Sequence, residues 1–215
     1  MSSRIPGGVR VRPGRYDDAR AVASIHTRAF PGFFLTELGP RFLNAYYRAV
    51  TSAPGGILLV AEDETAIVGF VVGYTSERDF YRTLKRNPWR LFAAIGFHAV
   101  RHPSVVRSIW RRYHDAVNHA GEQSCEGAYL ASLAVDPAAS RSGTGGVLVR
   151  EFCIASALLG KREVYLTTDT DANEQVNRFY ERQGFSATSQ FTTSAGRRMN
   201  EYRKRCERDE PLQSR

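Results

Sequence analysis

The segment from Val135 to Val149, VDPAASRSGTGGVLV, limits what this chain can fold into more than any other stretch. An apolar strand ends before Pro137, a loop of small residues follows, and a helix begins among three glycines. The first N–H groups of a helix have no partner inside it, and the helix dipole adds partial positive charge there. Because glycine permits positive φ and a close backbone approach, the loop is suited to a pyrophosphate, with Arg141 beside it.

The competing interpretation of this segment is a tight turn between a strand and a helix with nothing bound. Two common phosphate-binding motifs are excluded by the residues themselves. The dinucleotide motif G-x-G-x-x-G is absent, and Val147 and Leu148 follow the glycines where a P-loop would carry Lys and Ser or Thr. The glycine loop alone therefore does not choose between a ligand and a plain turn.

Hydrophobic periodicity along the rest of the chain predicts the order β-α-α-β-β-(insertion)-β-α-β-α-β-β. This order indicates a single α/β domain over residues 1–215, with a mixed, mostly antiparallel central sheet of about seven strands and helices on both faces. The second helix is expected over about Thr36–Val50, with an apolar stripe formed by Phe42, Ala45, Tyr46 and Ala49. The expected strands are Val9–Pro13, Gly56–Asp63, Thr65–Thr75, Ala128–Pro137, Glu163–Asp169, Phe185–Thr192 and Arg197–Lys204. The other expected helices begin near Asp17, Gly145 and Asn173.

A basic, aromatic, helical insertion is expected at about residues 76–127, between the third and fourth strands. From Arg78 to Arg112 it carries nine Lys or Arg and one acidic residue, Asp79. Four interpretations stay open: contact with an anionic membrane surface, a cover over a phosphate-bearing acceptor, a homodimer contact, or helices on the sheet with a solvated basic face.

Composition narrows the class of protein. The 42% hydrophobic and 24% charged content is typical of a globular domain, and the net charge of +8 favours anionic partners. Three widely spaced cysteines indicate no disulfide framework, and no apolar run is long enough for a signal peptide or a membrane span, so a cytoplasmic protein is expected. No nucleic-acid-binding motif is present. No metal-ligand pattern is evident either: His98 and His102 are four residues apart but lack the intervening Glu of a zinc-protease helix.

A second motif, NEQVNRFYERQGF from Asn173 to Phe185, follows the strand that ends at Asp169. Together the two motifs resemble the GNAT N-acetyltransferase superfamily, which transfers an acetyl group from acetyl-coenzyme A to an amine. The matching residues are Val135, Pro137, Gly143 and Gly145 in the first motif, and Asn173, Tyr180, Gly184 and Phe185 in the second. The resemblance is strongest over Ala128–Phe185 and implies a GNAT-like fold, with acetyl-coenzyme A as co-substrate.

The resemblance also implies a cofactor site. Backbone groups of one strand would pair with the pantetheine arm where the neighbouring strand splays away, and the glycine loop would hold the pyrophosphate. Ser140 departs from the family pattern, because it stands where relatives usually have Arg or Gln. The expected cofactor-binding residues are Leu133, Ala134, Val135, Ser140, Arg141, Ser142, Gly143, Thr144, Gly145, Gly146 and Asn173.

Tyr180 matches the family position that protonates the leaving thiolate, and its alternative role is that of a core aromatic residue. Asn173 has the alternative role of a helix N-cap. The general base is left open between Asp169, Asp171 and a water chain through Ser132 or Tyr129. The expected acceptor-binding residues are Phe33, Phe34, Glu37 and Asn200, and the alternative for the phenylalanines is the core.

The leading functional hypothesis is an N-acetyltransferase acting on a primary amine of a small molecule, such as an amino sugar or nucleotide sugar, or of a peptide. Two alternatives come from other classes. One is a coenzyme A-binding regulatory protein without turnover, suggested by Ser140 and by the lack of a carboxylate on the strand Ala128–Val135. The other is a basic module associated with a membrane or a nucleic acid through the insertion.

Overall fold

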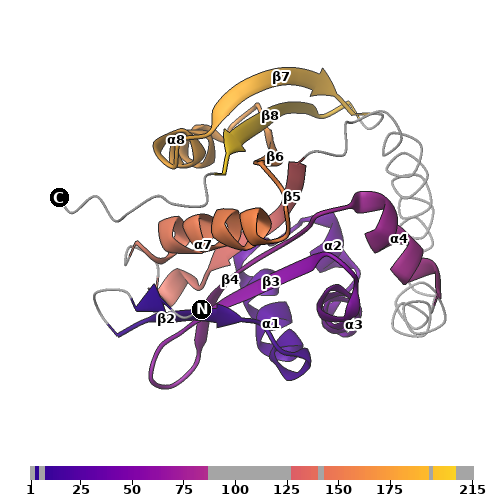
Figure 1. Ribbon diagram of the computed structural model, residues 1–215, viewed down its shortest axis with the longest axis vertical. Coiled ribbons are helices and arrows are strands. Elements are labelled where there is room, and N and C mark those ends of the chain that lie inside the picture. Colours follow the sequence, from indigo (N-terminus) through magenta and orange to yellow (C-terminus); the bar gives the residue numbers. More distant parts are fainter. Residues whose placement is uncertain (1–2, 5–7, 87–126, 140–142, 194–195, 207–215) are drawn as a thin grey trace.

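The computed structural model describes residues 3–4, 8–86, 127–139, 143–193 and 196–206 (Figure 1). The predicted insertion is therefore described only where it begins, as helix α4 (Glu77–Arg86). The predictions made for residues 87–126 and for Ser140, Arg141 and Ser142 lie outside the described residues.

The described strands form one sheet in the order β1-β2-β3-β4-β5-β6-β8-β7. All neighbours pair antiparallel except β5 and β6, which are parallel, so the predicted mixed, mostly antiparallel sheet is confirmed. The sheet contains the seven expected strands and one more, the two-residue edge strand β1. The strands are β1 (Ser3–Arg4), β2 (Arg10–Pro13), β3 (Gly56–Glu62), β4 (Ile67–Tyr74), β5 (Gly127–Val135), β6 (Glu163–Asp169), β7 (Ser186–Thr192) and β8 (Arg198–Arg205).

Helices cover both faces of this sheet, as predicted (Figure 1). Helices α1 (Ala19–Ala29) and α3 (Pro40–Ser52) pack on one face, and α7 (Thr144–Leu158) and α8 (Glu174–Arg182) pack on the other. Side chains of a strand point alternately to the two faces. In β4, Phe70 and Val72 accordingly join the core under α1 and α3, whereas Val71 joins the core under α7. Because such strands are buried on both faces, their sequences are continuous apolar runs rather than alternating patterns.

The predicted start of the second helix was wrong. Helix α3 begins at Pro40, because Gly39 has a φ of 86° that no helical residue adopts, and proline is well suited to the first turn. Thr36 belongs to a separate short helix, α2 (Phe34–Glu37), and its hydroxyl donates to the carbonyl of Phe30 at 2.7 Å. The stripe was also placed partly wrong, since Ala45 and Ala49 are only partly buried. The buried residues of α3 are Phe42, Leu43, Tyr46, Tyr47 and Val50.

The parallel strands β5 and β6 part along their length. They pair only from Gly127 to Tyr129 on β5 and from Glu163 to Tyr165 on β6, although β5 continues to Val135. On its other side β5 stays paired with β4, with an irregularity opposite Gly73. The sheet therefore opens like a wedge between β5 and β6, at the position where the resemblance placed a slot.

The helices among the described residues are all too short or too polar to cross a lipid bilayer.

Candidate active site

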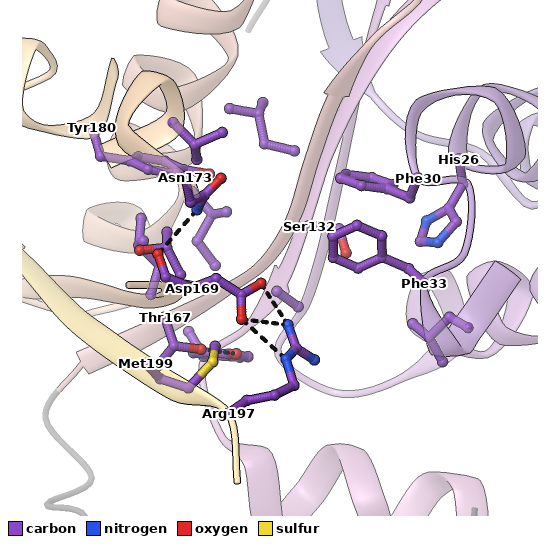
Figure 2. A pocket seen from close by; sticks show the side chains of 18 residues that line it. His26, Phe30, Phe33, Ser132, Thr167, Asp169, Asn173, Tyr180, Arg197 and Met199 are labelled. Carbon is purple, nitrogen blue, oxygen red and sulfur yellow. Dashed lines mark hydrogen bonds and ion pairs between the residues drawn. The ribbon is translucent and has the colours of Figure 1, made fainter. Parts of the chain in front are cut away.

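A cavity of about 370 Å³ lies at the opening between β5 and β6. Figure 2 shows residues of β6, α8 and β8 on one side of it, and on the other side aromatic residues from the end of α1 and from the residues just before α2. Ser132 of β5 lies between the two groups. The lining residues are His26, Phe30, Phe33, Leu35, Tyr129, Leu130, Ala131, Ser132, Leu133, Leu166, Thr167, Thr168, Asp169, Asn173, Val176, Tyr180, Arg197 and Met199.

Tyr180 reaches the cavity from the last turns of α8. Its side chain is 7% exposed, and its ring makes edge contacts with Phe179 and Phe185, with centroids 5.1 and 5.6 Å apart. Burial, with a smaller contribution from Tyr129, raises the pKa of the Tyr180 phenol well above its usual value. The hydroxyl is therefore held protonated at a cavity wall, so that the same ring is both a core residue and a potential proton donor.

Asn173 immediately precedes α8 and also lines the cavity. Its side chain makes no capping hydrogen bond to the helix. Instead, its Nδ2 group donates to the carbonyl oxygen of Asp169 at 3.2 Å, and Asn177 Nδ2 donates to the same oxygen at 3.3 Å. The Asn173 side chain is thus oriented by the end of β6, with its amide at the cavity wall.

Asp169, at the end of β6, is the carboxylate that lines the cavity. Arg197 binds both of its oxygens, with nitrogen–oxygen distances of 2.6, 2.7 and 3.0 Å (Figure 2). Asp171, the other carboxylate considered from the sequence, is exposed, pairs with Arg198 and is not among the lining residues. Of the two carboxylates considered from the sequence, only Asp169 therefore lies on the cavity wall.

The opposite wall is aromatic. Phe30 and Phe33 meet edge to face with centroids 5.4 Å apart, and Phe33 is 48% exposed. The structure places Phe33 at the cavity, whereas the side chain of Phe34 lies outside the described part of the chain. Glu37 is exposed and does not line the cavity. Asn200 does not line it either, because its Oδ1 accepts hydrogen bonds from Thr170 at 3.0 Å and Gln190 at 2.9 Å.

His26 is a cavity residue that sequence reasoning missed. Helical spacing can place it on the buried face of the first helix, but periodicity does not say that this face ends at a cavity. The side chain is 3% exposed, and its Nδ1 lies 2.6 Å from the Tyr47 hydroxyl. Burial lowers the pKa of His26 to about 4, so that the ring is neutral near pH 7.

This burial predicts acid sensitivity of the fold. Between the ordinary histidine pKa of about 6.5 and the folded value of about 4, the unfolded state binds more protons, so stability falls as the pH falls through this window. We expect a loss of up to about 3 kcal/mol between pH 7 and pH 4, at roughly 1.4 kcal/mol per pH unit. Urea unfolding of wild type and His26→Gln at both pH values measures it. The other histidines contribute equally to both proteins, so equal losses in the two would contradict the assignment to His26.

The glycine loop lies beside a second hollow, of about 470 Å³, lined by Gly143, Gly146, Val147, Arg150, Arg182, Gln183, Gly184 and Lys204. Gly143 precedes α7 with a φ of 74°, and a Cβ built there would meet nothing within 4 Å. Among these lining residues three are cations and none is acidic. Arg150, Arg182 and Lys204 were not predicted, because they come from three different elements that only the fold brings together.

The other two glycines of the loop have a packing role. A Cβ on Gly145 would lie 3.4 Å from the Phe179 ring, and one on Gly146 would lie 3.0 Å from Gln183 Oε1. The absence of side chains at these positions therefore lets α8 approach the start of α7. Of the three glycines, only Gly143 has open space above it.

Comparison with known proteins agrees with this architecture. The model of the acetyltransferase (GNAT) family matches residues 19–185. The sequence has no significant match among curated proteins.

Solved structures share the fold at low sequence identity. A GNAT-family protein from Desulfovibrio desulfuricans is 18% identical, with 93% of this chain and 99% of that chain covered and a TM-score of 0.62. Ard1 from Thermoplasma volcanium is 16% identical, with 93% and 99% covered and a TM-score of 0.59. The yncA protein from Salmonella typhimurium, solved with its cofactor acetyl-CoA, is 12% identical, with 94% and 96% covered and a TM-score of 0.58.

The mixed sheet parts between two parallel strands, beside a helix that begins at a glycine loop. This arrangement is an acetyltransferase-type fold. Because the family model covers most of the sequence, the chain belongs to the acetyltransferase (GNAT) family.

Proposed function

We propose that this protein transfers the acetyl group of acetyl-coenzyme A to the nitrogen of a primary amine. The observation that carries this proposal is the wedge between β5 and β6, where a protonated, buried tyrosine and a carboxylate line one cavity. A thioester held in the wedge would have a proton donor for its sulfur and a negative charge for an approaching ammonium group within the same cavity.

The residues of the wedge and the glycine loop fit acetyl-coenzyme A. The edge of β5 beyond Tyr129 is not paired with β6, so backbone groups of Leu133, Ala134 and Val135 can pair with the amides of the pantetheine arm. The positive end of the α7 helix dipole and the open space above Gly143 suit the pyrophosphate. The cationic hollow beside them, with Arg150, Arg182 and Lys204, suits the remaining phosphate of the nucleotide.

Tyr180 is our proposed general acid. Amine nitrogen attack on the thioester carbon forms the new C–N bond and breaks the C–S bond, and the departing thiolate needs one proton. The Tyr180 hydroxyl donates it, and burial keeps the phenol neutral, with its proton in place, before the C–S bond breaks. The tyrosine is then reprotonated from solvent.

Asp169 is our proposed binding group and proton acceptor for the amine. Its carboxylate lies on the cavity wall, where it attracts an ammonium group and takes up the proton that the amine must lose. Arg197 fixes the orientation of the carboxylate with charge-assisted hydrogen bonds. The alternative of a coenzyme A-binding protein without turnover rested on Ser140, which lies outside the described residues, and on the missing carboxylate of β5. Asp169 of β6 offers a carboxylate at the cavity, which weakens the second of these grounds.

The first test is a calorimetric titration with acetyl-coenzyme A, paired with release of free thiol in the presence of amines. We expect Gly143→Asp to weaken binding about 100-fold or more, because a carboxylate would face the pyrophosphate at the start of α7. Gly143→Asn is the matched control, since Asn has the same shape and tolerates positive φ but has no charge. It should weaken binding clearly less than Gly143→Asp, because both side chains fill the open space above Gly143 but only Asp adds a negative charge. Equal weakening by Asp and Asn would mean that shape, not charge, matters at Gly143.

A further inference from the structure

The described lining of the cavity carries no net charge, because its two charged side chains form one ion pair. These are Asp169 and Arg197, whose nearest atoms lie 2.6 Å apart. Both side chains remain accessible, since 28% of Asp169 and 40% of Arg197 is exposed. An accessible ion pair on a cavity wall can therefore share its charges with a ligand.

The guanidinium group of Arg197 uses only part of its donor capacity on Asp169. Its Nε and Nη2 atoms donate to the carboxylate over distances of 2.6 to 3.0 Å. Nη1 carries N–H donors as well, yet it donates to none of the described residues. In Figure 2 this nitrogen points away from Asp169, toward the side of the view on which Phe30 and Phe33 lie. Nη1 is thus open to an anionic group of a ligand.

A zwitterion fits this ion pair better than a simple cation does. Both oxygens of Asp169 already accept charge-assisted hydrogen bonds from Arg197, so the charge of the carboxylate is largely balanced before an ammonium group arrives. A ligand with an ammonium group and a carboxylate brings a second pair of charges. Its ammonium group can lie beside Asp169 and its carboxylate beside Nη1 of Arg197, so that each charge has a partner of opposite sign.

Large apolar side chains on the cavity wall are left exposed. Phe33, just before α2, is 48% exposed, and Val176 of α8 is 40% exposed, although both line the cavity. Phe30 lines it as well and contacts the Phe33 ring. Covering such side chains with an apolar group removes apolar surface from water, which favours binding. The part of the ligand that lies beyond its charged groups is therefore expected to be apolar.

We infer that the acceptor is an α-amino acid with an apolar side chain, and that Arg197 selects it by binding its carboxylate. The amino group lies beside Asp169, and the side chain packs against the apolar residues of the lining. The inference rests on the acetyl transfer proposed above and names the acceptor class. The transfer forms the C–N bond and breaks the C–S bond as described there, and it yields the N-acetyl amino acid, free coenzyme A and one proton.

The test compares L-leucine with L-leucinol, in which an uncharged alcohol replaces the carboxylate. With the full chain and saturating acetyl-coenzyme A, we expect kcat/KM from thiol release to be about tenfold or more higher for leucine. L-Asparagine, which has a polar side chain of similar size, should be acetylated about tenfold less efficiently than leucine. Equal kcat/KM for leucine and leucinol, or for leucine and asparagine, would overturn the inference.

Arg197→Met and Arg198→Met form a matched pair of variants. Each removes an arginine that pairs with an aspartate, but Arg198 and its partner Asp171 do not line the cavity. Arg197→Met should bring the ratio of kcat/KM for leucine and leucinol close to one, mainly through KM of leucine, and Arg198→Met should leave it unchanged. Loss of the contacts that orient Asp169 would lower both rates alike, so the ratio reports the carboxylate contact. An unchanged ratio in Arg197→Met, or the same fall in Arg198→Met, would contradict the assignment.

A second measurement does not need turnover. Coenzyme A has no acetyl group to transfer, so leucine and leucinol can be titrated calorimetrically into the protein with coenzyme A present. We expect wild type to bind leucine about tenfold or more tightly than leucinol, and Arg197→Met to bind the two alike. Equal affinities in wild type would count against the role of Arg197.

The titration with acetyl-coenzyme A separates the two ways to fail. If the cofactor binds wild type and Arg197→Met but leucine has no advantage over leucinol, the acceptor class is wrong and the cofactor site stands. If the cofactor does not bind wild type, the acetyl transfer itself is wrong, and the inference fails with it. Thermal unfolding shows whether Arg197→Met is folded, and Arg197→Gln serves in its place if it is not.

Discussion

Tyr180→Phe is expected to lower kcat for amine acetylation by about 100-fold or more, because a positioned general acid contributes roughly 10²–10⁴-fold. The substitution removes only the hydroxyl and leaves the ring that packs against Phe179 and Phe185. The dissociation constant for acetyl-coenzyme A should stay within about threefold, because the proton is needed only when the C–S bond breaks. Steady-state kinetics by thiol release and a calorimetric titration of the same preparation measure both quantities.

Phe185→Leu is a suitable control for Tyr180→Phe. Phe185 contacts the Tyr180 ring and is 3% exposed, yet it does not line the cavity. This variant should lose roughly 1 kcal/mol of stability and much less activity than Tyr180→Phe. If Tyr180→Phe keeps wild-type kcat, the hydroxyl has no part in the rate-limiting step, and Tyr180 is a core residue only.

Gly73→Ala is expected to give the largest loss of stability among the substitutions considered for this chain. A Cβ built on Gly73 lies 2.0 Å from the carbonyl oxygen of Tyr129 and 2.6 Å from the Phe152 ring. Backbone cannot move aside as a flexible side chain can, so β4 and β5 would have to separate. We expect a loss of about 4 kcal/mol, which corresponds to roughly 10 °C in Tm for a domain of this size.

Gly69→Ala on the same strand is the matched comparison. Its Cβ would meet the Ala134 carbonyl at 3.1 Å, a contact that requires a shift of only a few tenths of an ångström. It should cost about 1 kcal/mol or less. Urea unfolding of the two variants, each against wild type, measures the difference. Equal stabilities would show that β5 adapts easily at the irregularity opposite Gly73. Tyr129 is the last residue of β5 that pairs with β6, so Gly73→Ala also tests how firmly the start of the wedge is held.

Much of the fold was predictable from the sequence because local chemistry and tertiary packing agree. The strand Glu163–Asp169 was predicted with its observed bounds, and the glycines after α7 and α8 have φ values of 82° and 80°, as helix-ending glycines do. The prediction failed at Thr36, because an apolar periodicity continues across Gly39, where the backbone turns. Helical spacing reports which side chains share a face, but it does not report a break in the backbone.

The candidate site was predictable in its motifs and not in its partners. Tyr180 and Asn173 were expected from the second motif, and the structure places both at the cavity. Asp169 was one of several open choices for the base, and only its position on the cavity wall separates it from Asp171. Glu37 and Asn200 were chosen because they lie on expected elements near the acceptor, yet their side chains point elsewhere. The direction of a side chain depends on register, which a single sequence does not reveal.

The sequence by itself determined the order of the elements, the glycine loop at the start of a helix and the pair of motifs typical of the family, because each depends on residues close together in the chain. Only the tertiary structure decided what faces the wedge. His26, Asp169, Arg197 and Phe33 come from four segments, and they share a cavity because β5 and β6 part and α1 packs across the opposite face. A donor that no described residue accepts, such as Arg197 Nη1, becomes visible only after every neighbouring donor and acceptor has been placed.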